Sequence, residues 1–228
     1  MRGKIVLVTG ANGGLGNFVT QAFLDAGAIV IWSSRKISQS EFKSANFVAL
    51  PAELTSHDAA KTLVDQVIGR FQRLDVLAHT VGAFAGGATV AETDDATWHR
   101  MFDLNLNATF NILRAALPAL RRAGNGRIIA IGSRAAVDPG AAVGAYSASK
   151  AAMVSLVRTV AIENRDAGVT ANVILPGTID TPTNRAAMPQ ADFSKWVQPA
   201  NIASLVVWLA SEAGKEITGA AIPMYGDV

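Results

Sequence analysis

The segment KIVLVTGANGGLG at residues 4–16 decides the fold, because an apolar run passes directly into a cluster of glycines. Residues 4–9 are too few for a helix and are bounded by a glycine, which is typical of a strand buried on both faces. Glycines between such a strand and a helix let backbone N–H groups approach a pyrophosphate at the positive end of the helix. A glycine-rich turn without a ligand is the alternative interpretation. We favour a dinucleotide site, and the residues expected to contact the dinucleotide are Gly10, Asn12, Gly14, Leu15 and Gly16.

Outward from this segment, short apolar runs alternate with amphipathic stretches along the chain. Such alternation implies right-handed crossovers between parallel strands. The sequence therefore predicts an α/β fold, in which a doubly wound, seven-stranded parallel sheet carries helices on both faces. We expect one domain over residues 1–228, because no linker interrupts the pattern. The predicted strands are residues 4–9, 28–32, 46–50, 74–78, 127–131, 170–175 and 220–224, and the predicted helices are residues 15–26, 56–71, 93–122, 145–167 and 199–212.

Three local signals refine this pattern. Ser56 and Asp94 precede helical stretches and have side chains that cap helix N-termini. Pro118 is expected to kink or end the helix over residues 93–122 near its last turn. Residues 33–45 are too few and too polar for a full crossover helix, so we expect the alternation to be broken there.

The composition excludes several classes of protein. The 228 residues include no cysteine, which excludes disulfides, thiol redox chemistry and cysteine-ligated metals. Apolar residues make up 50% of the chain and charged residues 17%, which excludes disorder. The net charge is only +2, so neither a nucleic acid nor an anionic membrane is expected as a partner. No run resembles a signal peptide or a membrane span of ~20 apolar residues, and we expect a cytoplasmic protein.

Tyr146 and Lys150 are the first candidate catalytic pair. They stand four residues apart in a predicted helix and therefore share one helix face. A nearby ammonium lowers the pKa of a phenol and makes it a usable general acid or base. Such a pair is common on protein surfaces, but Ser133 lies thirteen residues upstream, just past a predicted strand. This placement favours a catalytic interpretation.

Taken in order, the motifs resemble those of the short-chain dehydrogenase/reductase family across the whole chain. The resemblance implies a single Rossmann-like domain that binds a nicotinamide dinucleotide and acts on a carbonyl or an alcohol. The matching motifs are residues 9–16 (TGANGGLG), Asn105 within LNL, Ser133 within IGS, Tyr146 with Lys150, and residues 176–182 (PGTIDTP).

The resemblance also implies a role for each matching residue. Tyr146 would pass the proton to the substrate oxygen, and Ser133 would orient the carbonyl. Lys150 would hold the nicotinamide ribose and lower the pKa of the tyrosine, and Asn105 would hold a water that links the lysine to bulk solvent. Tyr146 and Lys150 are thus expected to contact the cofactor as well. Further cofactor contacts are expected from Gly82, Pro176, Gly177, Ile179 and Thr181.

The end of the second predicted strand indicates which cofactor is used. Sites selective for NAD carry an acid there for the adenosine ribose, whereas an arginine accommodates a 2′-phosphate. This chain has Ser34, Arg35 and Lys36, with no acid between positions 25 and 41. A solvated basic turn is the alternative, but we favour NADP(H) over NAD(H). Glu53 and Leu54 occupy the place where the family contacts the adenine, although a glutamate is longer than the usual aspartate.

His79 is a departure from the family pattern, which commonly has an asparagine there. We interpret this histidine as a packed structural residue rather than a catalytic one. The three histidines, His57, His79 and His99, show no metal-ligand spacing. We therefore expect no metal site.

The segment over residues 179–196 is similar to the dihydropteridine reductase branch of the family. A substrate-side loop is expected at about residues 178–198. Within it, Met188, Phe193 and Trp196 indicate either a flat or apolar substrate or simply the packing of the loop, and the sequence does not separate the two. That branch lacks the catalytic serine and asparagine that are present here, which favours a carbonyl substrate.

These observations are compatible with three functions. The preferred one is NADP(H)-dependent hydride transfer to or from a small carbonyl or alcohol substrate. A pterin reductase that uses NAD(P)H is the alternative, and a non-catalytic protein that senses NADP(H) is a more remote one. The resemblance further implies a homo-dimer or homo-tetramer formed through the helices at residues 93–122 and 145–167.

Overall fold

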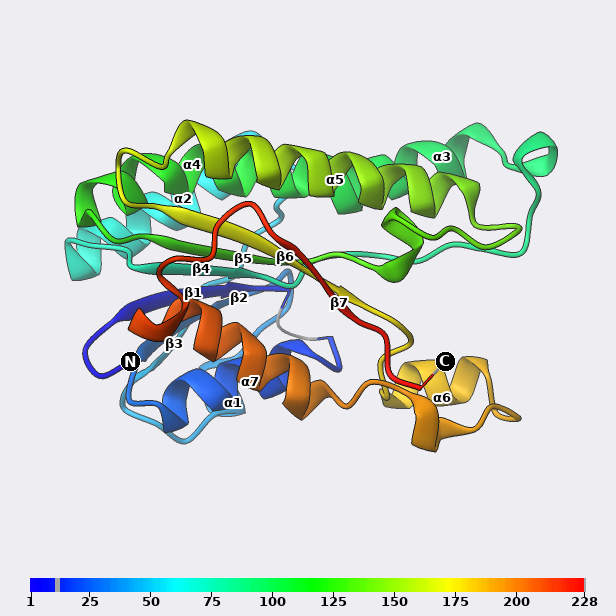
Figure 1. Ribbon diagram of the computed structural model, residues 1–228. Helices are drawn as coiled ribbons and strands as arrows, with labels where there is room; N and C mark the ends of the chain where they lie inside the picture. Colours follow the sequence, from blue (N-terminus) through cyan, green and yellow to red (C-terminus); the bar gives the residue numbers. More distant parts are fainter. Residues whose placement is uncertain (11–12, 228) are drawn as a thin grey trace.

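A seven-stranded parallel sheet runs through the molecule in the order β3-β2-β1-β4-β5-β6-β7 (Figure 1). The computed structural model describes residues 1–10 and 13–227. The fold prediction is confirmed, and each of the seven predicted runs forms a strand. The strands are β1 (Ile5–Thr9), β2 (Ile29–Ser33), β3 (Phe47–Ala49), β4 (Val76–His79), β5 (Arg127–Ile131), β6 (Thr170–Pro176) and β7 (Ala221–Met224).

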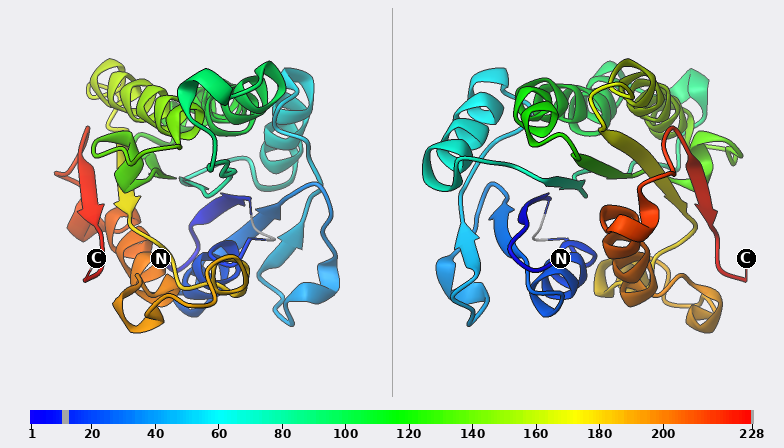
Figure 2. Two further views of the ribbon diagram at one scale, coloured as in Figure 1. Left: turned by 90° about the vertical axis from the view of Figure 1, so that its right-hand side faces the viewer. Right: turned by 60° about the vertical axis from the view of Figure 1, so that its left-hand side comes forward.

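Helices cover both faces of the sheet, as the alternation predicted. Helices α1 (Gly16–Asp25) and α7 (Pro199–Ala210) pack against each other on one face. Helices α2 (His57–Phe71), α4 (Ala108–Ala123) and α5 (Gly144–Glu163) cover the other face (Figures 1 and 2). In the described residues, no helix combines the length and the apolar character that a membrane crossing requires.

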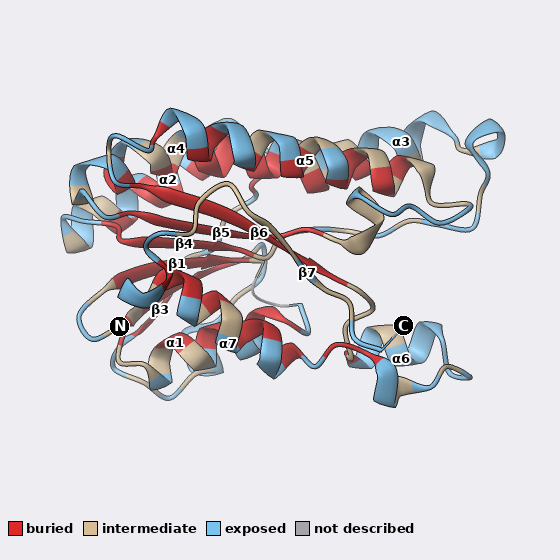
Figure 3. Cartoon of the chain, viewed as in Figure 1, coloured by how far each residue is buried: buried red, intermediate tan, exposed pale blue. Residues whose placement is uncertain are grey.

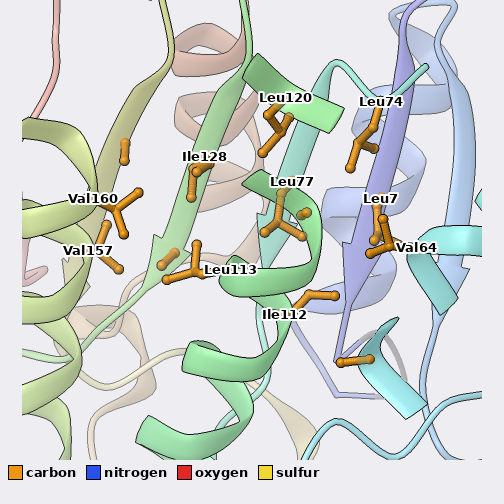
Figure 4. Packing of buried hydrophobic residues seen from close by; sticks show 14 of the residues in the cluster. Leu7, Val64, Leu74, Leu77, Ile112, Leu113, Leu120, Ile128, Val157 and Val160 are labelled. Carbon is orange, nitrogen blue, oxygen red and sulfur yellow. The ribbon is translucent and has the colours of Figure 1, made fainter. Parts of the chain in front are cut away.

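The central strands are buried on both faces because their side chains alternate between two cores (Figure 3). In β1, Leu7 belongs to the core under α2, α4 and α5, whereas Val6 and Val8 belong to the core under α1 and α7. Figure 4 shows Leu77 and Ile128 of the sheet facing Ile112 and Leu113 of α4. This packing fixes α4 on the sheet and with it the segment that precedes α4.

The predicted helix over residues 93–122 is divided in the structure. A short helix, α3 (Asp95–Phe102), leads into a π-helical turn, Asp103–Asn107, and only then does α4 begin. Pro118 does not end α4, which continues to Ala123 and stops at Gly124 with φ of 71°. Pro118 lies on the exposed side of the helix, where water can satisfy the carbonyl that its missing N–H leaves free.

The other local predictions are confirmed. The Ser56 hydroxyl accepts a hydrogen bond from the Ala59 N–H at 3.3 Å, and the Asp94 carboxylate accepts one from the Thr97 N–H at 2.6 Å. Between β2 and β3 the chain forms only a short 3-10 turn, Gln39–Glu41, instead of a crossover helix. Within the described chain, no crossover helix therefore lies between β2 and β3.

Candidate active site

The predicted site residues converge because parallel strands end at one edge of the sheet. Gly10 follows β1, Gly82 lies three residues beyond β4, Ser133 follows β5, and Gly177 follows β6. Chain order reverses on either side of β1, since β2 lies on one flank and β4 on the other. Such a switch point at the carboxyl ends of the strands is where ligands bind in open α/β sheets.

A cleft of about 760 Å³ opens at this edge. Its size is suited to an extended small molecule such as a dinucleotide. Six residues of the predicted cofactor set line it: Gly10, Ser34, Arg35, Glu53, Leu54 and Gly82. Other lining residues, including Thr55, Val81, Ala83 and Arg100, were not predicted from the sequence. Asn12 lies outside the described residues.

Two glycines in the predicted phosphate-binding loop have a steric requirement. Gly10 has φ of +81°, and a Cβ there would lie 2.4 Å from the Val81 backbone nitrogen. A Cβ on Gly14 would lie 2.7 Å from Cγ2 of Thr181. The glycine loop therefore touches the segments after β4 and β6, which brings Thr181 beside it. Because Leu15 and Gly16 are buried where α1 begins, they hold the start of that helix against the core.

The turn after β2 carries the predicted phosphate-selective group. The Arg35 side chain is 74% exposed, and its Nε lies 3.9 Å from a Glu53 carboxylate oxygen. The Ser34 hydroxyl donates to the Lys36 carbonyl at 2.9 Å, which shapes the turn. Arg35 and Lys36 line the cleft together with Arg100 of α3 and Glu53, so three cations and one acid are among its lining residues. The cleft has the charge needed to receive a phosphate.

Ser133 and Tyr146 do not line this cleft, but the fold brings their side chains together. Their side chains share a hydrogen bond, and Phe84 packs edge-on against the tyrosine ring with centroids 5.0 Å apart. Burial raises the pKa of Tyr146 above its ordinary value, and the hydrogen bond with Ser133 offsets this in part. The phenol is therefore protonated at neutral pH, which is the form that can donate a proton.

Lys150 lies in the interior of the site. Its ammonium is buried and donates to the Ile131 carbonyl at 3.0 Å. Burial lowers the pKa of Lys150 to about 8. The sequence predicted that Lys150 would lower the pKa of Tyr146, whereas burial raises the pKa of this phenol above its ordinary value. The reason is that desolvation outweighs helix-face proximity when both groups are largely buried.

Asn105 is fully buried and lies inside the π-helical turn, a feature frequent at functional sites. Its Oδ1 accepts from the Ala83 N–H at 2.8 Å, and its Nδ2 donates to the Ala83 carbonyl and to the Ser149 hydroxyl, each at 3.0 Å. Ser149 in turn donates to the Tyr146 carbonyl at 2.8 Å. The predicted role of Asn105 as a water-holding residue is untested, but its amide directly links the loop after β4 to the helix of the tyrosine.

Gly82 shows how closely these groups approach. A Cβ at this position would lie 2.8 Å from the Lys150 Nζ and 3.1 Å from the Asn105 Oδ1. A side chain there would collide with both predicted catalytic residues. Gly82 therefore lies where the cofactor cleft meets the catalytic group. The four catalytic candidates stay predictions, and Ala83 and Ser149 were not predicted, because their contacts with Asn105 join distant parts of the chain.

His79 is packed in the interior, as predicted. It is 1% exposed, and burial together with the charge of Lys150 lowers its pKa to about 3. Its Nδ1 lies 2.7 Å from the Thr9 hydroxyl, and its Nε2 lies 3.0 Å from the Thr109 hydroxyl. No group of histidine or acidic side chains in the described part of the chain could hold a metal ion.

The apolar residues of the loop after β6 divide into packed and exposed side chains. Trp196 is 6% exposed and packs against Phe193 with ring centroids 4.8 Å apart, so these two side chains pack the loop. Met188 is 42% exposed and remains available as an apolar surface. The backbone bridge between Ile179 and Val197 closes the base of the loop. Gly177 permits close packing there, since a Cβ would lie 2.3 Å from the Tyr225 carbonyl oxygen.

A nicotinamide dinucleotide fits these residues. The glycines beside β1 leave room for a backbone approach, the cationic turn lines the cleft, and Lys150 lies beside Gly82, which also lines it. The protonated phenol of Tyr146, four residues before Lys150 in α5, has the Ser133 hydroxyl as its partner. The arrangement is that of a nucleotide-dependent oxidoreductase.

Comparison with known proteins places the chain within one such family. A family model described as short chain dehydrogenase matches residues 4–192. A 3-oxoacyl-[acyl-carrier-protein] reductase of rhamnolipid biosynthesis from Pseudomonas aeruginosa is 32% identical, with 99% of this chain and 96% of that protein covered. A 2,3-dihydro-2,3-dihydroxybenzoate dehydrogenase from Escherichia coli is 31% identical, with 95% and 93% covered.

A solved short-chain type dehydrogenase/reductase from Mycobacterium ulcerans superposes with a TM-score of 0.93 at 28% identity, covering 100% of this chain and 90% of that one. The chain belongs to the short-chain dehydrogenase family. It is an NAD(P)-dependent oxidoreductase that acts on a small molecule.

Tyr146→Phe tests the proton donor of this site. The change keeps the ring and its contact with Phe84 but removes the hydroxyl, so kcat should fall by about 10²–10⁴-fold, the usual contribution of a general acid. Binding of NADPH, measured by fluorescence titration, should change little. Tyr225→Phe is the matched control and should leave kcat near the wild-type value. Near-normal turnover by Tyr146→Phe would show that another group supplies the proton.

Proposed function

We propose that the protein catalyses NADP(H)-dependent hydride transfer between the cofactor and an apolar ketone or the corresponding alcohol. The observation that carries this proposal is the hydrogen bond between Ser133 and a protonated Tyr146, beside a buried Lys150. The bound nicotinamide would supply or accept the hydride. Tyr146 donates its proton to the substrate oxygen during reduction, and Ser133 donates a hydrogen bond to the same oxygen. Lys150 would hold the nicotinamide ribose.

The fold gives each of these residues a distinct means of support. Ser133 has an extended backbone at the end of β5, and its hydroxyl also accepts from the Ala135 N–H at 3.2 Å, which orients it. Tyr146 lies in the first turn of α5, where Ser149 binds its carbonyl. Asn105 would act by holding the loop after β4 in place. Residues 1–228 form the proposed dinucleotide-binding and catalytic domain, with residues 178–198 as its substrate-side loop.

The proposed preference for NADP(H) rests on the charges at the β2 end of the cleft. Arg35 and Lys36 would pair with a 2′-phosphate, and Arg100 of α3 adds a third cation to the lining of the cleft. Glu53 opposes them, but its carboxylate is 3.9 Å from Arg35 and can be neutralised by that arginine. The cofactor contacts expected from Pro176, Gly177, Ile179 and Thr181 belong to the same proposal.

Exposed apolar side chains on the substrate side support an apolar substrate. Phe84 is 64% exposed although it packs against Tyr146, and Val90, Val137 and Met188 are exposed on the neighbouring loops. The charged residues nearby are paired, since Arg134 binds Asp138 and Arg185 binds Asp180. Solvent-facing aromatic and aliphatic groups beside a reactive phenol are suited to a ketone with an apolar ring or chain.

A pterin reductase remains the second candidate, because the loop over residues 179–196 is similar to that branch. The presence of Ser133 argues against it. A quinonoid pterin delocalises the incoming charge over a conjugated ring, whereas a ketone concentrates it on one oxygen and benefits more from a single donor.

Assembly into a homo-dimer or homo-tetramer is also part of the proposal. Phe110 on α4 and Ile162 on α5 are 44% and 71% exposed. Burying such side chains against a second copy would remove apolar surface from water.

Arg35→Ala tests the cofactor preference. Loss of a charge-assisted hydrogen bond should weaken NADPH binding by roughly 10- to 100-fold, while NADH binding should hardly change. The dissociation constants of both cofactors would be measured by fluorescence titration. Arg122→Ala, an exposed arginine at the opposite edge of the sheet, is the matched control. Equal losses for the two cofactors would contradict a 2′-phosphate site.

Ser133→Ala separates the two candidate substrates. On a ketone, kcat should fall by about 10²–10³-fold, because the hydroxyl stabilises charge that develops only in the transition state. On a quinonoid dihydropterin the fall should be much smaller. Both rates would be measured with saturating NADPH. A wild type that is faster on the pterin, with Ser133 dispensable, would support the second candidate instead.

Phe84→Ala tests the apolar substrate wall. It should lower kcat/KM for a phenyl ketone by about tenfold, which corresponds to the loss of ~1.4 kcal/mol of aromatic contact. The value for a small aliphatic ketone such as acetone should change much less, because that substrate does not reach the ring. Phe18→Ala removes a similarly exposed phenylalanine from α1 and serves as the control. Equal losses on both ketones would show that Phe84 supports Tyr146 rather than the substrate.

A further inference from the structure

A chain of buried side chains connects the cofactor loop to the catalytic turn through His79. Thr9 is the last residue of β1, His79 is the last residue of β4, and Thr109 lies in the first turn of α4. All three are at most 1% exposed. The Thr9 hydroxyl lies 2.7 Å from Nδ1 of the histidine, and the Thr109 hydroxyl lies 3.0 Å from Nε2. The Thr109 hydroxyl is also 2.8 Å from the Asn105 carbonyl oxygen.

The directions of these hydrogen bonds follow from the last contact. A carbonyl oxygen only accepts, so Thr109 donates its one hydroxyl proton to Asn105. Thr109 must therefore accept from His79, and the ring proton of His79 must be on Nε2. A neutral imidazole has one ring proton, which leaves Nδ1 as an acceptor for the Thr9 hydroxyl. Each donor in the chain is satisfied, and every bond points from β1 toward Asn105.

We propose that His79 is a positioning residue that acts through Thr109 to hold the π-helical turn in which Asn105 presents its amide. The proposal depends on the proposed function for the importance of Asn105, but the protonation of His79 can be measured independently. The Asn105 carbonyl is held by Thr109, while its side chain holds Ala83 and Ser149. The two ends of one residue are thereby tied to different parts of the site.

The same chain reaches the cofactor side. Thr9 immediately precedes Gly10, and its carbonyl accepts from the Thr80 N–H at 2.9 Å and the Thr80 hydroxyl at 2.8 Å. His79 therefore connects the start of the predicted phosphate-binding loop with the turn that supports Tyr146. Its nitrogens both have partners, so it has no free site to exchange protons with a substrate.

The first test measures the ring nitrogens of His79 by NMR in protein labelled with ¹⁵N-histidine. The expected result is the tautomer with the proton on Nε2, with no titration between pH 5 and 9. His57 and His99 are exposed to solvent, so their ring signals serve as references for unburied imidazoles in the same sample. A proton on Nδ1, or titration of His79 in this range, would overturn the proposal whether or not any substrate is known.

The second test uses a matched pair of variants. Thr109→Val keeps the shape of the side chain but removes its hydroxyl and thus the hydrogen bonds to His79 and Asn105. We expect kcat on the best ketone to fall by about tenfold or more, with KM for NADPH changing less than about threefold. Thr109→Ser keeps the hydroxyl and should restore kcat to near the wild-type value. His79→Gln, whose amide can still donate toward Thr109, should retain more kcat than His79→Leu.

The outcomes of these variants distinguish positioning from packing. If Thr109→Ser loses as much kcat as Thr109→Val, or if Thr109→Val lowers only the melting temperature, the hydrogen bond does not position the site and the proposal fails. Circular dichroism confirms folding of each variant. If the wild type reduces no carbonyl at all, the proposed function fails, but the NMR result still decides the direction of the hydrogen bonds through His79.

Discussion

The active site depends on the buried amide of Asn105. Its carboxamide binds both backbone groups of Ala83 and the hydroxyl of Ser149, and Ser149 binds the carbonyl of Tyr146. The loop after β4 and the first turn of α5 are therefore held by one side chain that has no exposure to water. Displacing this amide would leave several buried polar groups without partners, each at a cost of ~1–3 kcal/mol. The network is thus constrained to a single arrangement.

The apolar core makes that arrangement possible. Ile112 and Leu113 of α4 pack in the core and thereby fix the position of the first turns of this helix. Because the π-helical turn directly precedes α4, its position is fixed as well. An inserted residue in that turn redirects the side chains on either side of it. In this turn the Asn105 side chain points toward Gly82. A Cβ on Gly82 would crowd both the Lys150 amine and the Asn105 amide oxygen, so glycine suits this position.

Much of this structure could be predicted from the sequence, for reasons that are local. The seven strands were recognisable because buried parallel strands are short continuous apolar runs, and Gly10 was recognisable because a glycine follows the first of them. The division of residues 93–122 was not, because an inserted π-helical turn leaves the apolar spacing almost unchanged. Ser149, Ala83 and Arg100 were missed because their roles arise from contacts across the fold. The raised pKa of Tyr146 was missed because burial cannot be read from helix spacing.

The cofactor side and the catalytic side of the site differ in how tightly their side chains are constrained. At the β2 end, the Arg35 side chain is 74% exposed and meets its partner Glu53 only at 3.9 Å, so its charge can be changed without breaking a buried network. On the catalytic side, Asn105, Ser149 and Lys150 are buried. Substituting one member of such a network leaves the hydrogen-bonding groups of its partners unsatisfied. Cofactor preference can therefore be altered by single surface substitutions, whereas the proton-transfer group must be retained as a unit. His79 belongs to the constrained part of the site as well, because Thr9 and Thr109 satisfy both of its ring nitrogens in the interior.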